Sequence, residues 1–414
     1  MHPPAEVTHM AGKYDVIVVG ARCAGSPAAM LLARAGHRVL LVDRASFPSD
    51  AVSTHMVHAT GIEALSRWGL ADELAATGCP PIREYRFDFG PFTVAASPLP
   101  TPVGVDVAYG PRRTVLDKIL VDAAARAGAE VRENVTVRDL IVEDGKVTGI
   151  RAKGTGDGSA SMTEHAGLVI GADGRNSMVA EAVDATTYRE RPAANVAYYA
   201  YWGGLPVSAF DVHLRPGRVV AGMPTHDGLN CLVVAAQIAD MNDFRKDIEG
   251  NYLAAVRTVP EYADRLGGAT RETRFVGMTT PGFYRKPYGP GWALVGDAGY
   301  DRDPCTAQGI SDAFRDAELL AQAWLEVQSG QRTFDDAMAG YQSARDQRTL
   351  PIYEQTCERA TLAPPPPQAA ALLAAVAASP AASQGFISTI AGTLPVPEFF
   401  SDANIGKIMA SAAR

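Results

Sequence analysis

Short apolar runs that stop at a glycine recur along the chain and predict strands buried on both faces. The first run, YDVIVVG, ends at Gly20, and the Ala- and Leu-rich stretch after it predicts a helix closed by Gly36. HRVLLVDR then predicts a second buried strand. A strand, a glycine turn, a helix and a parallel strand within about thirty residues make a βαβ unit with a right-handed crossover.

The pattern changes beyond Thr186. The runs VAYYAYWGGL, VHLRPGRVVAGM and NCLVVAAQ predict strands of a mostly antiparallel sheet, and NDFRKDIEGNYLAAVRTV predicts a polar helix after them. After Pro290 the first pattern returns, with a buried strand in GWALVGDAG and a strong helix in ISDAFRDAELLAQAWLEV. Hairpins are expected in EYRFDFGPFTVAA and in ENVTVRDLIVEDGKVTGIRAKG, the latter turning at Asp144-Gly145.

We therefore predict an α/β fold, a Rossmann-like domain into which an antiparallel β-sheet domain is inserted. The first domain is expected to be discontinuous, over residues 12–75, 105–185 and 286–360. The second is expected over 76–104 and 186–285. Residues 361–414 follow as a helical tail that starts with a proline spacer, and its aromatic side chains predict that it docks on the domains.

Composition narrows the class of protein. The chain has 414 residues and a net charge of -8, which argues against a nucleic-acid partner because phosphate binding needs clustered positive charge. Five scattered cysteines without a C-x-x-C pair predict neither a disulfide framework nor a metal site. The aliphatic stretch from Ala369 to Ala378 is about half the length that a membrane span needs, and residues 1–13 lack an apolar signal core. We expect a cytoplasmic protein without a membrane span.

The first glycine turn, GARCAGS, predicts a dinucleotide site. Gly20 allows the tight turn and Gly25 allows the helix to pack closely, so that the free N–H groups of the helix point at a pyrophosphate. Arg22 stands where the usual fingerprint has its middle glycine. Asp43 ends the second strand at the distance from Gly20 at which an acid meets a ribose hydroxyl.

Two later segments, GADGRNS and GWALVGDAGYDRDPCTAQGISDAFRDAELLA, decide which dinucleotide is expected. Together with the glycine turn they resemble the three fingerprints of class A flavoprotein monooxygenases, the single-component FAD hydroxylases of the p-hydroxybenzoate hydroxylase fold. That superfamily also contains geranylgeranyl-reductase-like enzymes. The resemblance spans roughly residues 14 to 350, and it makes the first domain an FAD domain and the second a substrate domain.

The resemblance implies FAD contacts residue by residue. Asp43 would meet the adenosine ribose, Arg113 a phosphate and Asp297 the ribityl or pyrophosphate region, while Arg22, Arg44 and Arg113 would form a positive pocket. The helix from Ile310 would offer its positive end to the flavin. The full set expected at FAD is Gly20, Arg22, Ala24, Gly25, Asp43, Arg44, Arg113, Asp173, Gly174, Asp297, Pro304, Gly309 and Ile310.

NAD(P)H is expected to be a transient reductant, because the chain contains one dinucleotide fingerprint. Asp173 and Gly174 match a family motif implicated in both FAD and nicotinamide binding, but Ala180 replaces an arginine that many members carry. Tyr300 likewise replaces a histidine of many relatives, so no role of that histidine is transferred.

Catalytic candidates lie where the family fold places the isoalloxazine ring. Pro304 is expected beside the ring, and Ser53, Thr54 and His55 either bond the flavin or a substrate phenol or form an ordinary helix cap before His58. The second domain supplies further catalytic candidates. These are Tyr199 and Tyr201, which share one strand face, and His213. Ordinary sheet packing explains the tyrosines equally well, and we expect His213 to be a neutral surface imidazole rather than a phenol base.

The resemblance implies an FAD-dependent, NAD(P)H-consuming monooxygenase that hydroxylates a phenolic or polycyclic aromatic molecule with dioxygen, through a flavin C4a-hydroperoxide. Two alternatives stay open: a flavin-dependent C=C reductase of the geranylgeranyl-reductase type, and a non-catalytic flavin-fold protein that binds a small ligand. A flavin halogenase is disfavoured, because the chain has neither a W-x-W-x-I-P signature nor an obvious tunnel lysine.

Overall fold

A parallel sheet forms the centre of the first domain. In the computed structural model, which describes residues 14–53, 55–154 and 161–412, the strand order is β19-β20-β10-β1-β2-β7. The strands that run parallel are β1 (Tyr14–Val19), β2 (Val39–Val42), β7 (Glu130–Arg132), β10 (Ser161–Gly171) and β20 (Trp292–Leu294). β1 and β2 flank α1 (Gly25–Arg34), so the predicted βαβ unit is confirmed.

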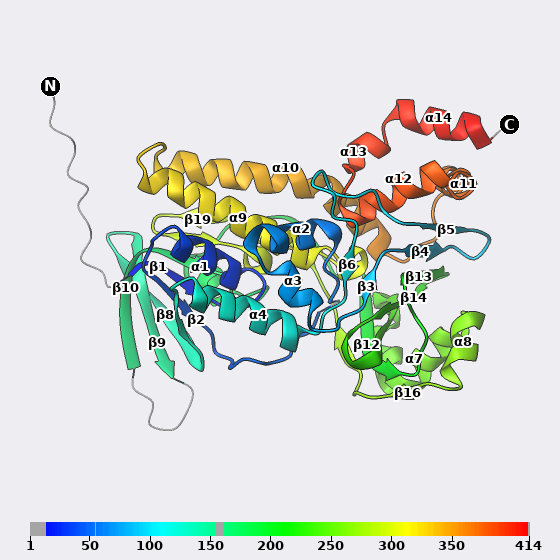
Figure 1. Cartoon of the computed structure of the whole chain (residues 1–414), viewed down its shortest axis with the longest axis horizontal. Helices are drawn as coiled ribbons and strands as arrows, with labels where there is room; N and C mark the ends of the chain where they lie inside the picture. The colour runs from blue at the N-terminus through cyan, green and yellow to red at the C-terminus, as the bar shows by residue number, and fades with distance from the viewer. Residues whose placement is uncertain (1–13, 54, 155–160, 413–414) are drawn as a thin grey trace.

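Each face of this sheet packs against a different layer (Figure 1). Val16, Val18 and Leu41 point to the helices α1, α2 (Ala59–Trp68), α4 (Arg113–Arg126), α9 (Gly309–Gln328) and α10 (Phe334–Ala360). Ile17 and Val19 point the other way, onto the antiparallel strands β8 (Val135–Glu143) and β9 (Lys146–Gly154) and the first half of β10. Because both faces are covered, nearly every position of β1 and β2 is apolar, as the sequence pattern indicates.

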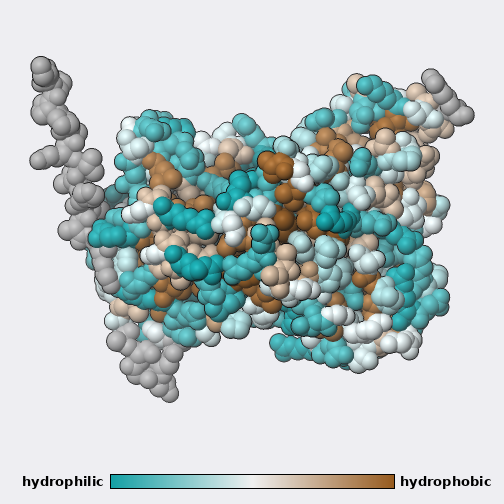
Figure 2. Space-filling model, in the orientation of Figure 1, coloured by the Kyte–Doolittle hydropathy of each residue, from teal (hydrophilic) through white to brown (hydrophobic). Residues whose placement is uncertain are grey.

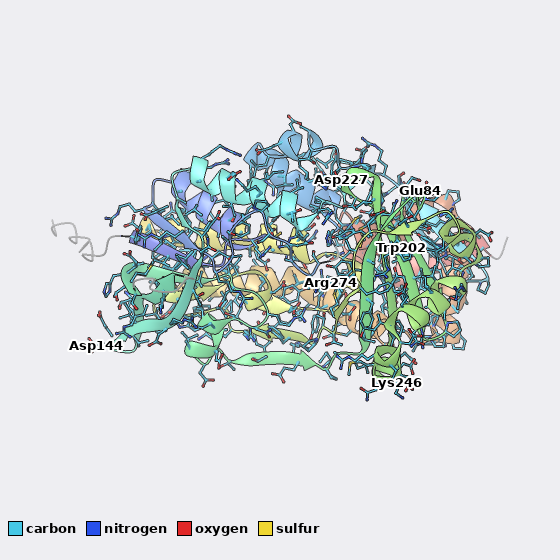
Figure 3. The ribbon with its side chains drawn as sticks, turned by 90° about the horizontal axis from the view of Figure 1, so that it is seen from below. Glu84, Asp144, Trp202, Asp227, Lys246 and Arg274 are labelled. Atoms are coloured by element: carbon cyan, nitrogen blue, oxygen red, sulfur yellow. The ribbon has the colours of Figure 1, made fainter. Side chains whose placement is uncertain are left out.

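The second sheet follows the order β16-β12-β15-β14-β13-β4-β5. Its strands are β4 (Tyr85–Asp88), β5 (Thr93–Ala96), β12 (Asn195–Gly203), β13 (Phe210–Arg215), β14 (Arg218–Pro224), β15 (Leu229–Gln237) and β16 (Thr270–Arg271), with β17 (Val276–Met278) also paired to β12. Figure 3 shows this sheet around Trp202, at the opposite end of the molecule from the β8–β9 hairpin tip at Asp144. Both predicted hairpins are present.

Helices cover both faces of this second sheet. Tyr198, Ala200 and Trp202 pack toward α6 (Met241–Lys246), α7 (Ile248–Arg257) and α8 (Pro260–Leu266), whereas Tyr199 and Tyr201 point to the opposite face. The alternation expected of β12 is thus confirmed. The prediction of one polar helix before α8 was wrong. The helix is interrupted at Asp247, which separates α6 from α7 and whose side chain caps α7. α2 ends at Gly69, which has a left-handed conformation, and a separate short helix α3 (Ala71–Ala75) follows.

The tail docks on the second sheet, as its aromatic residues predicted. α11 (Pro367–Ala377) and α12 (Pro380–Ala391) pack on β5, and α13 (Val396–Phe399) and α14 (Asp402–Ala412) follow. Ser388 Oγ of α12 accepts from the Leu99 backbone N–H at 2.8 Å. Among the described residues no single helix is long and apolar enough to cross a bilayer; α11 and α12 together pass that test, but they bend by 116° and pack on the sheet.

Short strands join the two domains. β11 (Thr187–Arg191) and β18 (Gly282–Arg285), which we had placed in the second domain, pair in one small sheet with β21 (Tyr300–Asp301) of the first. β3 (Pro81–Ile82) and β6 (Ala108–Tyr109) also pair across the expected boundary. The loops that line the candidate site therefore connect to strands at the junction of the two domains.

Candidate functional site

One large cavity collects the residues expected at FAD. It has a volume of about 820 Å³ and runs from the β1–α1 turn past Asp173 to the loop before α9. All of the thirteen residues expected at the cofactor, apart from Gly25, line it. The volume lies within the range of cofactor sites. The structure therefore brings these residues to one place, and their contact with FAD itself stays a prediction.

Gly20 and Gly25 make the first turn too close for any side chain. A Cβ atom on Gly25 would lie 1.8 Å from the carbonyl oxygen of Gly20, and one on Gly20 would lie 2.4 Å from the carbonyl oxygen of Ala172. Gly20 also has φ +102°, which favours glycine. Gly25 therefore acts by packing α1 on β1, while Gly20 leaves its backbone open to the cavity. This turn fits a pyrophosphate at the N-terminus of α1.

Two arginines at this turn share one buried carboxylate. Asp117 of α4 accepts from Arg113 Nε at 2.9 Å and from Arg22 Nη1 at 2.5 Å. Arg22 also donates to Ser49 Oγ at 3.0 Å. Arg22 replaces the middle glycine of the usual fingerprint, and its side chain is drawn sideways onto Asp117, so that it forms part of the cavity wall. The two guanidinium groups are thus held in place for an anion.

Asp43 sits at the end of β2 with its carboxylate fixed by backbone. Its Oδ2 accepts from the Ala21 N–H at 2.7 Å and its Oδ1 from the Ala45 N–H at 2.8 Å. The carboxylate is therefore held beside the glycine turn, in the place where a ribose hydroxyl is expected.

Asp173 and Asp297 occupy the middle of the cavity wall. Asp173 accepts from Ser177 Oγ at 2.6 Å and from the Met178 N–H at 2.7 Å, so it caps α5 (Met178–Ala182) as well as lining the cavity. Asp297 presents its side chain to the open cavity. The surrounding protein raises the pKa of Asp297, and Arg175 and Arg113 oppose that rise.

The expectation of a positive pocket holds only at the dinucleotide end of the cavity. Arg22, Arg44 and Arg113 gather there, but the whole lining contains five arginines and seven aspartates. Toward α9 the acids bond to protein partners: Asp301 pairs with Arg175, and Asp303 accepts from the Asn195 side chain at 2.7 Å. The net charge and the arginines of the sequence could not predict these ion pairs and hydrogen bonds, because each joins side chains that are distant along the chain.

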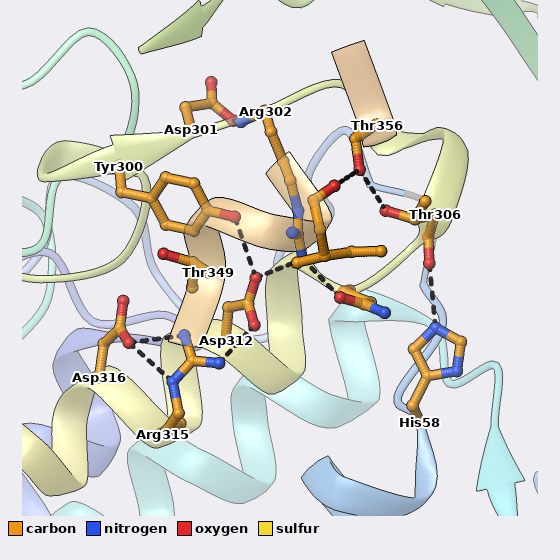
Figure 4. Close-up of polar contacts among 12 residues, drawn as sticks. His58, Tyr300, Asp301, Arg302, Thr306, Asp312, Arg315, Asp316, Thr349 and Thr356 are labelled. Carbon is orange, nitrogen blue, oxygen red and sulfur yellow. Dashed lines mark hydrogen bonds and ion pairs between the residues drawn. The ribbon is translucent and has the colours of Figure 1, made fainter. Parts of the chain in front are cut away.

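A buried ionic network lies at the start of α9 (Figure 4). Asp312 accepts from Arg302 at 2.5 Å and from Arg315 at 2.8 Å, and Arg315 also pairs with Asp316 at 2.8 Å. Burial opposes ionisation of Asp312, but the two arginines outweigh it and lower its pKa. Tyr300, which replaces the family histidine, directs its hydroxyl at Asp312 over 3.4 Å. The network fixes the loop from Pro304 to Gly309, which lines the cavity.

His55, Tyr199 and Tyr201 form one cluster beside the cavity. Tyr201 Oη contacts His55 Nε2 in a hydrogen bond, and the ring of Tyr199 lies edge-on to His55 with centroids 5.7 Å apart. Arg112 lies over the Tyr201 ring at 4.5 Å. His55 has φ +65°, a left-handed backbone rare for a residue other than glycine, held by bonds to Ser53. Ser53 lines the cavity and bonds to His55, whereas His55, Tyr199 and Tyr201 themselves do not line it. Thr54 lies outside the described residues.

The tautomer of His55 follows from its partners. Its Nδ1 lies 2.7 Å from the Ser53 carbonyl oxygen, which only accepts, so Nδ1 carries the proton. Nε2 therefore accepts from the Tyr201 hydroxyl. Burial, aided by Arg113, lowers the pKa of His55 to about 4, so the ring is neutral near pH 7.

Two other histidines, His58 and His213, are buried and contact polar groups of the protein. His58 Nε2 lies 3.1 Å from the Thr306 carbonyl and its Nδ1 2.7 Å from Tyr85 Oη, so it joins α2, β4 and the loop before α9. The expectation of a surface His213 was wrong: the ring is fully buried, with Asp88 and Asp211 each 3.0 Å from one of its nitrogens. It shares the strand face of Asp211 and packs edge-on to Tyr262, away from the His55 cluster, because β13 turns Phe210 and Val212 to that side.

Sequence reasoning missed several residues that shape the site. Asp117, Arg175, Arg302 and Asp312 were not among the candidates, although Asp117 is one helical turn from Arg113 and could have been found by that i, i+4 spacing. The others depend on contacts between distant segments. Among the described residues no group of three or more His, Cys, Asp or Glu side chains is arranged to hold a metal ion.

The comparisons with known proteins agree with this geometry. A family model described as an FAD binding domain matches residues 13–356. Digeranylgeranylglycerophospholipid reductase 1 of Methanopyrus kandleri is 26% identical over 368 residues, which cover 85% of this chain and 91% of that protein. The myxobacterial chondrochloren halogenase CndH has a TM-score of 0.77 at 22% identity and covers 96% of both chains. PqsL of Pseudomonas aeruginosa, titled a probable FAD-dependent monooxygenase, has a TM-score of 0.69 at 21% identity and covers 83% of this chain and 94% of its own.

The chain belongs to the FAD binding domain family, since the model matches most of its length. At their identities the solved structures show the fold alone, and that fold is the expected α/β flavoenzyme fold. Together these findings define an FAD-dependent oxidoreductase.

Proposed function

We propose that this protein is a monooxygenase that takes electrons from NAD(P)H and hydroxylates a phenolic or polycyclic aromatic molecule. The bound flavin would supply the oxygen-transfer chemistry: one oxygen atom of O₂ enters the arene C–H bond, the other leaves as water, and NAD(P)H is oxidised to NAD(P)⁺. The observation that carries the proposal is the hydrogen-bonded pair of Tyr201 and His55 beside the cavity.

This pair offers a hydrogen-bonding group to a phenol. His55 is neutral near pH 7 and its Nε2 accepts the Tyr201 proton, so the Tyr201 oxygen keeps its lone pairs for another donor. A substrate hydroxyl placed against that oxygen could donate a hydrogen bond to it, whereas His55, with a pKa near 4, does not take up the proton of a phenol at pH 7. The hydrogen bond would hold the substrate ring in one orientation toward the electrophilic oxygen.

The surroundings of the pair suit a flat apolar substrate. Val52, which is 56% exposed, lines the cavity next to Ser53 and offers an apolar surface there. The rings of Tyr199, Tyr201 and His55 pack edge-on to one another behind Ser53, which bonds to His55. PqsL, a structural neighbour, has also been solved in complex with 2-aminobenzoylacetate, an aromatic molecule.

A second candidate is a flavin-dependent reductase of an isolated C=C bond. The observation in its favour is the relationship to digeranylgeranylglycerophospholipid reductases, which extends over most of both chains. In that case NAD(P)H would add two electrons and one hydrogen to the alkene, a proton from water would add the other, and oxygen would not be consumed.

Halogenation has weaker support in the chain itself. Chondrochloren halogenase shares the fold, but no lysine of the described residues lines the FAD cavity or the 530 Å³ cavity between α2, α9 and α10, and the W-x-W-x-I-P signature is missing from the sequence.

A screen of the FAD-loaded protein separates these functions. Oxygen uptake that depends on an added phenol, with a product heavier by one oxygen atom, supports the monooxygenase. Anaerobic saturation of an isoprenoid alkene supports the reductase. NADPH oxidation that no added compound changes contradicts both and favours a protein that only binds its ligand.

Matched variants of one strand test the role of the pair. Tyr201→Phe should lower coupled hydroxylation of a phenol at pH 7 by about tenfold, the size expected for the loss of one hydrogen bond to the substrate, without changing FAD affinity. Tyr198→Phe, on the other face of β12, should leave the rate unchanged. Equal rates in the two variants would contradict the assigned role.

A further inference from the structure

A second cavity lies on the other side of the first turn of α9 from the FAD cavity. Its volume is about 530 Å³, within the range of small-molecule sites. Its floor comes from α9 and α10, one wall from α2 and the other from the segment that joins α12 to α13. Figure 2 shows hydrophobic surface near the centre of this face, in the region where α2 meets the C-terminal segment. The residues expected at FAD do not line this second cavity.

One wall of this cavity is apolar. Leu394, Pro395, Val396 and Pro397 line it in succession from the C-terminal segment, and Ile352 of α10 faces the same space. Pro395 and Pro397 fix their own φ angles and so restrict the conformations of this segment. Such a wall favours a compact apolar body rather than a sugar or a nucleotide.

Among the charged side chains that line this cavity, one arginine has no ion-pair partner in the described part of the chain. Each acid of the lining has an arginine partner: Glu63 and Glu318 lie 2.7 Å from the guanidinium of Arg67, and Asp312 pairs with Arg302 and Arg315. Arg348, by contrast, donates to the Gly392 carbonyl oxygen at 3.0 Å, and no carboxylate of the described part of the chain forms an ion pair with it.

Two further features lie close to Arg348 in this cavity. The Ser311 hydroxyl, on the cavity floor in the first turn of α9, is buried and has no hydrogen-bond partner among the described residues. Desolvation and the neighbouring Arg315 lower the pKa of Arg348, and Asp312 opposes that shift.

We propose that this cavity is a binding site for a small carboxylate with an apolar body, whose anionic group bonds to Arg348 and whose apolar part lies against Leu394 to Pro397. The site is separate from the FAD cavity, although Asp312 borders both. It does not depend on which reaction the flavin carries out.

The test uses calorimetric titration of the FAD-loaded protein, so that the first cavity is already filled. The probes are 2-naphthoate and its uncharged analogue 2-naphthamide. We expect one naphthoate to bind per chain and naphthamide to bind about tenfold more weakly, as for the loss of one charge-assisted hydrogen bond. Octanoate, run beside them, shows whether the apolar wall prefers a chain or a ring.

Variants then locate the binding. Arg348→Gln should weaken naphthoate about tenfold and leave naphthamide unchanged, whereas Arg348→Lys should keep most of the affinity because it keeps the charge. Thr393→Trp, in the cavity wall, should block both probes. Arg257→Gln, an exposed arginine of α7 that does not line the cavity, should change nothing.

Each alternative outcome overturns the proposal. Naphthoate that binds wild type and Arg348→Gln equally, or naphthamide that matches naphthoate, excludes an anion site at Arg348. No saturable heat with either acid up to its solubility limit excludes the site altogether. The flavin absorbance of each variant shows that it is folded and loaded with FAD.

Discussion

The contact between Gly25 and Gly20 allows a sharp test of the glycine turn. In Gly25→Ala the new Cβ would start 1.8 Å from the Gly20 carbonyl oxygen, whereas real Cβ contacts essentially never fall below 3.0 Å. The opposing atom is backbone at the end of a central strand, so it cannot rotate away as a side chain would. Overpacking of this kind costs about 1–3 kcal/mol, and we expect the upper end of that range. Because the turn itself must open, FAD affinity should fall as well.

Gly309→Ala is the matched control. It adds the same methyl group at another residue of the same cavity, but no atom lies within 4 Å of the new Cβ, and Gly309 starts a helix. The apoprotein should therefore keep its stability or gain up to about 1 kcal/mol. If the flavin approaches Gly309 as the family resemblance implies, FAD affinity alone should fall.

Chemical unfolding of the two apoproteins, followed by circular dichroism, and FAD titration by quenching of flavin fluorescence measure both quantities. The two variants should separate: Gly25→Ala loses stability and affinity, and Gly309→Ala loses affinity only. If Gly25→Ala unfolds at the same denaturant concentration as wild type, the close approach of α1 to the turn is not as described and the reasoning fails.

Two further predictions concern buried charge and buried imidazoles. Asp117→Asn should destabilise the apoprotein by about 3 kcal/mol, because it leaves the buried Arg113 without its carboxylate partner. It should also weaken FAD binding about tenfold, because Asp117 no longer holds the side chains of Arg22 and Arg113 in place. Unchanged thermal unfolding and unchanged FAD affinity would contradict this prediction. His55 and His58 both have a folded-state pKa lowered by burial to about 4 from 6.5, so the unfolded chain binds more protons between these values. Stability should therefore fall as pH drops from about 6.5 to about 4, by roughly 3 kcal/mol for each histidine, and His58→Gln should flatten the slope of unfolding free energy against pH.

Local patterns in the sequence were enough to predict the strands, the turns and the order of the motifs. Val16 to Val19 are apolar at every position because both faces of β1 are covered, and that pattern is visible without the fold. Gly20 and Gly25 stand at a spacing that only a strand–turn–helix junction requires. The face shared by Tyr199 and Tyr201 likewise follows from the two-residue period of a strand. These inferences succeed because each depends on neighbours within one turn or one strand.

The tertiary structure decided which charges are paired and which rings meet. His213 looked like a surface imidazole, and its burial depends on β13 lying beside β4 and beneath α8. The positive pocket was expected from arginines alone, but Asp301 and Asp312 bring acids into the same cavity. His55 meets Tyr201 across 146 residues of chain. Electrostatic and hydrogen-bond energies depend on distances in space, and a chain of alternating acids and arginines is compatible with many pairings until the fold selects one. The sequence therefore determined that a flavin domain is present and where its turns lie, whereas only the packed structure decided how the cavity is charged and which groups line it.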